Sequence, residues 1–214
     1  MDSKYSYKYD DKGIYCYKDT DVLINKLSIK SDVEFNKAER LFAALRHSEL
    51  DKNPLPGNFD FNHLKAIHKY LFQDLFDWAG KIRTVAIAKK SMFCLPQFID
   101  SYANDIFSNL AMSNYLEGLS EKDFIEKLTE LYADINALHP FREGNGRTQR
   151  EFIKYVAGIN GYGLEWSLIK SDENIIASHE SVNGNNTKLL YIITKIIYPL
   201  TKEETKRYRK IFNK

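Results

Sequence analysis

One short stretch of the chain, HPFREGNGRTQR at residues 139–150, gathers side chains that can hold and transfer a phosphorylated group. An imidazole can act as a general base near neutral pH. Guanidinium forks bind phosphate oxygens two at a time, and one carboxylate often holds Mg²⁺ together with phosphates and water. The residues concerned are His139, Glu143, Gly144, Asn145, Gly146, Arg147 and Arg150. Their combination predicts a site for a metal-bound nucleotide from which part is transferred.

A helix is predicted to lead into this stretch. Apolar side chains recur at steps of three and four across residues 121–138, which is typical of an amphipathic helix. Ser120 followed by Asp123 resembles a capping box at its start. Pro140 disfavours helical geometry at the preceding residue. We therefore expect His139 where the helix ends and a loop begins.

A second helix is predicted to follow the glycine-rich turn. Gly144 and Gly146 permit positive φ and close backbone approach to a ligand, and successive N–H groups in such a turn form an anion-binding nest. A helix that begins near Asn145 adds its unpaired N–H groups and its dipole to the attraction for phosphate. Arg147 and Arg150, three residues apart, would lie on one face of that helix.

Each component of the stretch also has an ordinary structural explanation. A histidine at a helix end, a Gly-Asn-Gly turn and two arginines three apart occur in many proteins without a ligand. Their joint occurrence within twelve residues favours a site. Two other nucleotide motifs do not fit: no Gly-Lys-Ser/Thr follows as in a Walker A loop, and the stretch is not Gly-x-Gly-x-x-Gly after a strand.

Position by position, the stretch matches H-P-F-x-[D/E]-G-N-G-R-x-x-R, the signature of the Fic family (filamentation induced by cAMP), which the chain therefore resembles. Residues 61–85 look like the Fic core helix that leads into a hairpin. Residues 5–28 look like the lead-in of stand-alone bacterial members, so the resemblance covers approximately residues 5–170. It implies the Fic fold and protein adenylylation, in which AMP passes from ATP to a hydroxyl of a target protein, with Mg²⁺ and release of pyrophosphate.

The resemblance also implies a role for each residue of the motif. His139 would be the general base, and Glu143 would hold Mg²⁺ on the α- and β-phosphates. Backbone N–H groups of Gly144, Asn145 and Gly146 would form the anion hole, and the Asn145 side chain would contact phosphate. The β- and γ-phosphates would be bound by Arg147 and Arg150, while Phe141 would anchor the loop in the core.

Fic proteins present their target beside a hairpin flap, which the resemblance places at residues 84–93. The β-prone run that would dock the target consists of Thr84, Val85, Ala86, Ile87 and Ala88, and residues 89–91 could turn the chain. An exposed strand edge binds a target segment by main-chain pairing, without reading much sequence. A hairpin packed against helices would instead be only structural.

Three functions are compatible with these residues. The first is an AMP transferase acting on a protein. The second is a phosphate or UMP transferase of the same fold, although phosphate-transferring relatives depart from the intact glycines found here at Gly144 and Gly146. The third is a module that only binds a nucleotide, for which the base His139 would be unnecessary.

Regulation is expected to come from a partner. Many Fic proteins are inhibited by a helix with the pattern [S/T]-x-x-x-E-[G/N], whose glutamate pairs with the arginine corresponding to Arg150. SNYLEG at residues 113–118 fits in letters but lies inside the core, which favours coincidence, and the C-terminal region has no match. We therefore expect the toxin half of a toxin–antitoxin pair, with a small antitoxin supplying the glutamate in trans.

Composition is consistent with one all-α domain over residues 1–214, with a lead-in (1–31), a core (about 32–170) and C-terminal helices (171–214). Helices are predicted at residues 32–49, 60–78, 97–112, 121–138, 146–158, 171–181, 187–198 and 201–211.

A net charge of +2 indicates no nucleic-acid or membrane partner. Two cysteines and a polar N-terminus indicate a reduced, cytoplasmic protein. The target and its Ser, Thr or Tyr are not encoded, although related toxins modify type II DNA topoisomerase subunits.

Overall fold

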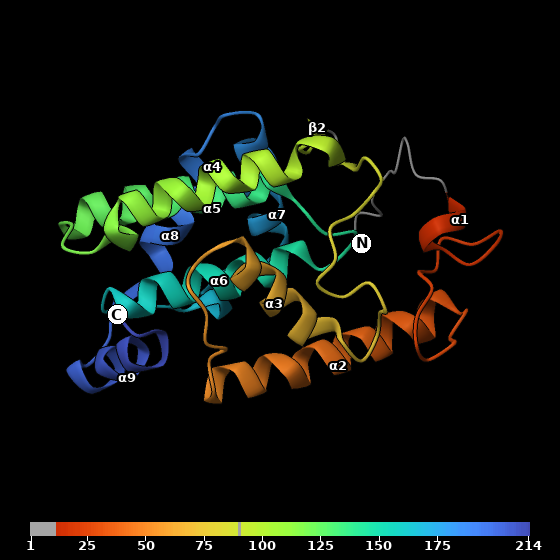
Figure 1. Cartoon of the computed structure of the whole chain (residues 1–214), viewed down its shortest axis with the longest axis horizontal. Helices are drawn as coiled ribbons and strands as arrows, with labels where there is room; N and C mark the ends of the chain where they lie inside the picture. The colour runs from red at the N-terminus through yellow and green to blue at the C-terminus, as the bar shows by residue number, and fades with distance from the viewer. Residues whose placement is uncertain (1–11, 90) are drawn as a thin grey trace.

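The computed structural model describes residues 12–89 and 91–214 and is mainly helical, as predicted (Figure 1). Three short 3-10 helices also occur, at Pro96–Phe98, Asn114–Leu116 and Trp166–Leu168. The α-helices are α1 (Lys12–Tyr15), α2 (Asp32–Lys52), α3 (Phe61–Phe72), α4 (Ile99–Met112), α5 (Glu121–Leu138), α6 (Asn145–Ile159), α7 (Ser171–Val182), α8 (Thr187–Ile196) and α9 (Lys202–Phe212). The strands are β1 (Ala88–Lys89), β2 (Ser91–Met92), β3 (Tyr162–Leu164) and β4 (Ile197–Pro199).

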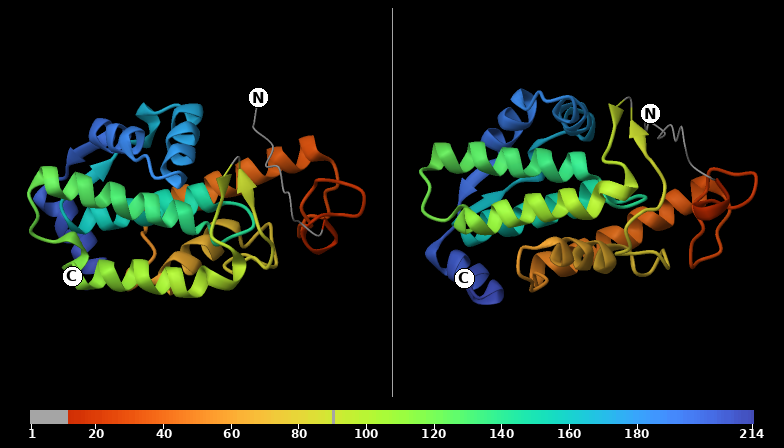
Figure 2. Two further views of the ribbon diagram at one scale, coloured as in Figure 1. Left: turned by 90° about the horizontal axis from the view of Figure 1, so that it is seen from above. Right: turned by 45° about the horizontal axis from the view of Figure 1, so that its top comes forward.

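Helix α6 lies at the centre of the bundle. It packs against α3, α5 and α9, while α5 also contacts α4, α7 and α8 (Figures 1 and 2). Phe152, Ile153, Tyr155 and Val156 on α6 are all fully buried. A helix that is buried on most sides belongs to the core rather than to the surface, so the residues at the start of α6 are anchored to the core of the bundle.

Local signals explain where several helices begin. The Asp60 carboxylate accepts a hydrogen bond from His63 N at 2.7 Å and so caps the start of α3. The Ser120 hydroxyl accepts from Asp123 N at 3.2 Å at the start of α5. A complete capping box formed by Thr201 begins α9, a feature that the sequence analysis did not identify.

The predicted helix at residues 60–78 was too long, because α3 ends at Phe72. Residues 73–80 instead form turns that close with Gly80 at φ +80°. The N–H of Gly80 donates to Nδ1 of His68 at 2.8 Å, which folds this segment back onto α3. A side chain of α3 therefore binds the backbone just beyond the predicted helix and holds the turns that replace its last part.

A second small sheet was not predicted. Strand β3 pairs antiparallel with β4, and α8 consequently ends at Ile196 rather than at residue 198. Pro199 favours extended backbone at Tyr198, which suits a strand better than a helix. This sheet ties the segment after α6 to the C-terminal helices.

The predicted flap strand was displaced along the chain. Ala88 and Lys89 form β1, whereas residues 84–87 lie in bends and extended backbone. The N–H of Thr84 donates to the Tyr15 hydroxyl at 3.1 Å, and the carbonyl of Val85 accepts from an arginine side chain at 2.6 Å. Because side chains take these backbone groups, they do not join a ladder. The expected turn centres on residue 90, outside the described residues.

The buried apolar side chains form one cluster that includes Tyr15, Leu64, Phe152 and Phe212. It therefore draws on the lead-in, the centre and the C-terminal helices. The division of the chain into these three parts stays a prediction. Among the described helices, none combines the length and apolar character needed to cross a bilayer.

Candidate active site

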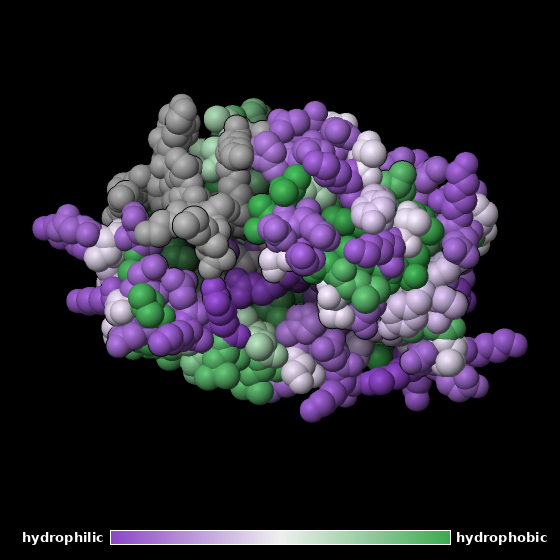
Figure 3. Space-filling model, turned by 180° about the vertical axis from the view of Figure 1, so that it is seen from behind, coloured by the Kyte–Doolittle hydropathy of each residue, from purple (hydrophilic) through white to green (hydrophobic). Residues whose placement is uncertain are grey.

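A cavity of about 790 Å³ opens where α2, the end of α5, the start of α6 and α7 meet. Seen from behind, the surface is hollowed near its centre, and the floor of the hollow is strongly hydrophilic (Figure 3). His139, Glu143, Gly144, Arg147 and Arg150 border this cavity. The structure thus brings the predicted motif residues to one place.

His139 directly follows α5 as its C-cap and has left-handed backbone geometry, with φ 43° and ψ 57°. Its side chain is almost fully buried at the cavity wall and stacks on Phe93, with ring centroids 3.7 Å apart. Its Nδ1 lies 3.3 Å from the carbonyl oxygen of Asn136, which can only accept. This contact favours a proton on Nδ1 and therefore places the basic lone pair on Nε2.

The loop after His139 turns sharply at Gly144, where φ is +81°. A Cβ at this position would lie 2.3 Å from the ring of Phe72, so both conformation and space require glycine. The Gly144 N–H donates to Oε1 of Glu143 at 3.0 Å, which holds that carboxylate at the cavity edge. The loop is therefore shaped by close packing against α3.

The N-terminus of α6 borders the cavity, and no side chain of the described residues caps it. The first N–H groups of a helix have no partner within the helix. Those of Asn145 and Gly146 are consequently available to an anion, and the helix dipole adds to the attraction. The anion hole itself stays a prediction, and in this structure the Gly144 N–H of that predicted set donates to the Glu143 carboxylate instead.

The Asn145 side chain differs from the expectation that it contacts phosphate. Its Oδ1 accepts from Phe141 N at 2.9 Å, and its Nδ2 donates to Phe141 O at 2.7 Å. Both ends of the amide are thus used to close the loop, because Asn145 is buried beneath it. In this structure the side chain braces the loop, and only the backbone N–H of Asn145 is offered to a ligand.

His68 of α3 supports the same loop from behind. Since its Nδ1 accepts from Gly80 N, its Nε2 carries the proton and donates to the Glu143 carbonyl at 2.9 Å. The imidazole also stacks on Phe141 at 3.8 Å. Complete burial lowers the pKa of His68 to about 3, so the ring is neutral. His68 therefore has a structural role, and its contact with the motif was not predicted from the sequence.

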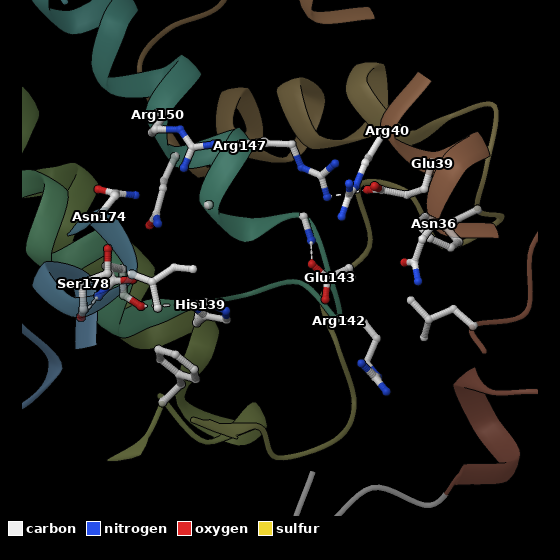
Figure 4. Close-up of a pocket in the computed structure, with 18 of the residues that line it drawn as sticks. Asn36, Glu39, Arg40, His139, Arg142, Glu143, Arg147, Arg150, Asn174 and Ser178 are labelled. Carbon is white, nitrogen blue, oxygen red and sulfur yellow. Dashed lines mark hydrogen bonds and ion pairs between the residues drawn. The ribbon is translucent and has the colours of Figure 1, made fainter. Parts of the chain in front are cut away.

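Arg147 and Arg150 place their guanidinium groups on the same side of the cavity (Figure 4). Arg150 lies over the Trp166 ring at 5.8 Å. Arg147 forms an ion pair with Glu39 of α2, a residue that sequence reasoning missed. One signal was present: Glu39 falls on the helix face of the buried Phe35 and Ala43, where a carboxylate requires a cationic partner.

Further polar side chains complete the cavity wall. Asn36 and Arg40 of α2 and Asn174 and Ser178 of α7 face it from opposite sides (Figure 4). Sequence analysis gave no reason to choose them, because helices so distant in the chain meet only in the fold. Arg142, at the variable position of the motif, points away from Glu143 and lies over Tyr15 at 5.6 Å.

A second polar cluster lies where α2 meets α6 and contains His47, Asp51 and Glu151. The ammonium of Lys154 lies 2.7 Å from Asp51 and 2.6 Å from Glu151. Lys154 therefore occupies the position of a cation, and the cluster joins two helices rather than forming a metal centre.

The sequence has clear relatives. Residues 58–157 match the Fic/DOC family. "Probable protein adenylyltransferase Fic" of Escherichia coli is 35% identical over 184 residues, a region that spans 86% of this chain and 91% of that relative. The chain belongs to the Fic/DOC family. This Fic chain is also 40% identical over 188 residues to "Protein adenylyltransferase VbhT" of Bartonella schoenbuchensis, of which it spans 39% of the length.

Solved structures show the same Fic fold. BepC of Bartonella tribocorum, crystallised with AMPPNP, has a TM-score of 0.84 and 26% identity, and the match covers 89% of this chain and 98% of that one. The Fic domain of a Bartonella quintana effector with bound ADP has a TM-score of 0.81 and 28% identity, and the match covers 89% and 96%. The predicted fold is confirmed.

Proposed function

We propose that this chain is a protein adenylyltransferase that transfers AMP from ATP to a hydroxyl side chain of another protein. The observation that carries the proposal is one cavity that joins the Nε2 lone pair of His139 to the uncapped N-terminus of α6. A base beside a phosphate cradle is needed for transfer and is unnecessary for binding alone. Two relatives described above, VbhT of Bartonella schoenbuchensis and the Escherichia coli protein, are named as a protein adenylyltransferase and a probable protein adenylyltransferase.

The proposed reaction uses residues that the fold already positions around the cavity. Nε2 of His139 takes the proton of the target hydroxyl while that oxygen bonds to the α-phosphorus. The bond from the α-phosphorus to its bridging oxygen breaks, and pyrophosphate leaves. N–H groups of Asn145 and Gly146 stabilise charge on the α-phosphate oxygens, and Arg147 and Arg150 bind the leaving phosphates.

Mg²⁺ fits this site through Glu143. The carboxylate is half-buried, borders the cavity and is oriented by the Gly144 N–H at 3.0 Å. One carboxylate completed by phosphate oxygens and water is an ordinary magnesium environment. When bound, the ion would neutralise part of the charge on the phosphates.

The flap is the proposed docking place for the target. Strand β2 lies against α7, which makes β1 the outer strand of the two-stranded sheet. Thr84 and Val85 already use a backbone N–H and a carbonyl within the molecule, and the Ile87 carbonyl accepts from Phe93 N at 3.2 Å. Main-chain pairing with a target would therefore fall on Ala86 and β1. A type II topoisomerase subunit is the target to test first.

Labelled ATP tests the proposal directly. The protein is incubated with α-labelled or γ-labelled ATP and a bacterial lysate, with His139→Ala as the matched variant. Protein labelled only from the α position is expected, with loss by about 10²–10⁴-fold in the variant while nucleotide binding remains. Label from the γ position would indicate phosphate transfer. Nucleotide binding without transfer would indicate that the protein is a module that only binds a nucleotide.

We also propose that inhibition comes in trans, from a small antitoxin helix that places a glutamate on Arg150. No carboxylate of the described residues pairs with Arg150. Glu39 pairs instead with Arg147, and Glu117 of the SNYLEG stretch pairs with Arg209 at 2.8 Å. That second ion pair involves α9, outside the cavity lining, which supports the interpretation of SNYLEG as coincidence.

The in-cis alternative is tested with Glu39→Gln, because the Glu39 carboxylate pairs with Arg147 of the motif. We expect no strong activation, since Arg150 stays unblocked in either protein. Activation comparable to that from removing an antitoxin would refute inhibition in trans. A reduced cytoplasmic setting is proposed because Cys16 and Cys94 are not joined in a disulfide.

A further inference from the structure

Arg83 lies at the junction between the flap and the motif loop. Its side chain is 2% exposed. Its Nε donates to the carbonyl of His139 at 2.8 Å, its Nη1 to that of Val85 at 2.6 Å, and its Nη2 to that of Cys94. Its own N–H donates to Pro140 O at 2.9 Å. Arg83 thus binds the backbone where the flap begins, at Val85, where it ends, at Cys94, and at the proposed base, His139.

The chemistry of these contacts is specific to arginine. Only a planar fork with five donors can reach three carbonyls in different directions. Within residues 12–89 and 91–214 no carboxylate neutralises Arg83, and burial lowers its pKa to about 10. Burying a guanidinium is unfavourable unless its donors are satisfied, so the three carbonyls are the reason that it can be accommodated here.

Two further contacts carry the position of the flap to the imidazole. The N–H of Cys94 donates to Ala137 O at 3.0 Å, near the end of α5. Phe93, which directly precedes Cys94, stacks on the His139 ring at 3.7 Å and 14°. If the exit of the flap moves, Phe93 moves with it, and the ring that it supports is displaced.

The phosphate cradle has separate supports. The Glu143 carbonyl is held by His68, and the Phe141 backbone is held by Asn145. None of these bonds involves Arg83. Loss of Arg83 should therefore affect the flap and the imidazole while leaving the nucleotide cradle in place.

We propose that Arg83 is a positioning residue that fixes the target-docking flap relative to His139, and so sets where a docked hydroxyl meets the base. This inference rests on the proposed adenylyltransferase function. A displacement of about 1 Å at a reacting centre can cost about 10²-fold in rate. The effect should appear in transfer to protein and be absent from ATP binding.

The test compares Arg83→Ala and Arg83→Lys with Arg46→Ala. Arg46 is the matched control because it bonds Asp74 and Glu49 at the contact of α2 with α3, outside the cavity lining. Label transferred from α-labelled ATP to lysate protein is followed together with the ATP dissociation constant. Hydrogen exchange at the amides of Phe93 and Cys94 reports directly how firmly the end of the flap is held.

Arg83→Ala should lose at least about 100-fold in transfer, keep ATP affinity within about two-fold, and exchange the Phe93 and Cys94 amides faster. Guanidinium ion at concentrations below those that denature should restore part of the transfer by entering the vacated space. Transfer by Arg83→Lys should lie between that of Arg83→Ala and that of the unaltered protein, since an ammonium cannot reach three carbonyls. Arg46→Ala should transfer normally.

Three results would overturn the proposal: unchanged transfer in Arg83→Ala, an equal loss of ATP binding, or an equal loss of transfer in Arg46→Ala. The second and third would show only general destabilisation. If the unaltered chain transfers no label, the proposed function fails and the positioning role falls with it. The amide exchange of Arg83→Ala would then still decide whether Arg83 holds the flap.

Discussion

Replacing Gly144 by alanine should disable the phosphate cradle through a steric conflict that the structure locates. The new Cβ would lie 2.3 Å from the Phe72 ring, which is itself fully buried and cannot swing into solvent. The backbone φ of +81° adds strain of about 1–2 kcal/mol for a residue with a Cβ. Moving a packed ring adds about 1–3 kcal/mol.

Gly184 provides a matched control. It has nearly the same φ, +85°, but nothing lies within 4 Å of an added Cβ. Gly184→Ala should therefore show only the backbone strain, about 1–2 kcal/mol. Gly144→Ala should lose about 1–3 kcal/mol more, because only that variant must displace Phe72.

Urea unfolding measures the free energy of unfolding of both variants, and calorimetric titration measures the affinity of each for ATP. Gly144→Ala should lose ATP binding and Gly184→Ala should keep it. Adding Phe72→Leu to Gly144→Ala should recover part of the loss, as a favourable coupling in a double-mutant cycle. Equal destabilisation of the two alanine variants, or normal ATP binding by Gly144→Ala, would refute the reasoning.

Three further predictions concern other parts of the molecule. Because burial lowers the pKa of His68 from 6.5 to about 3, the unfolded chain binds more protons between these values, and the free energy of unfolding should fall as pH drops below 6.5. The fall is about 2 kcal/mol at pH 5, and urea unfolding at pH 7 and pH 5 should show a smaller fall for His68→Gln. Thr201→Ala removes the capping box with Glu204 and should cost about 1 kcal/mol of stability, measured by urea unfolding, without changing ATP affinity. Arg150→Ala should weaken ATP binding about 10–100-fold and leave AMP binding unchanged, by titration with each nucleotide.

The motif could be read from the sequence because its chemistry is local. His139 to Arg150 fall within twelve residues, and the proline and glycines at defined offsets specify how the helix ends and the loop turns. Periodicity located α5 for the same reason, because that helix has one continuous stripe of apolar residues, and the glycine-rich turn indicated where α6 begins. The fold class followed from these local patterns.

The supports of the site could not be read in the same way. Glu39, His68 and Arg83 reach the motif from more than fifty residues away, and their partners are mostly backbone carbonyls, which leave no pattern in the sequence. The flap strand was misplaced because Arg83 and Tyr15 take backbone groups that strand propensity had assigned to a ladder. Tertiary contacts decided those positions.

The start of α6 shows why a site of this kind can persist in a stable fold. A side-chain cap on a helix contributes about 1 kcal/mol, and α2, α3, α5 and α9 each have one. At the start of α6, Gly144 offers no side chain to cap it. The loss is tolerable because α6 is buried on most sides and anchored by α3, α5 and α9. A cap would satisfy the N–H groups that phosphate must bind, so a helix held by packing on most sides can leave its N-terminus open for a substrate.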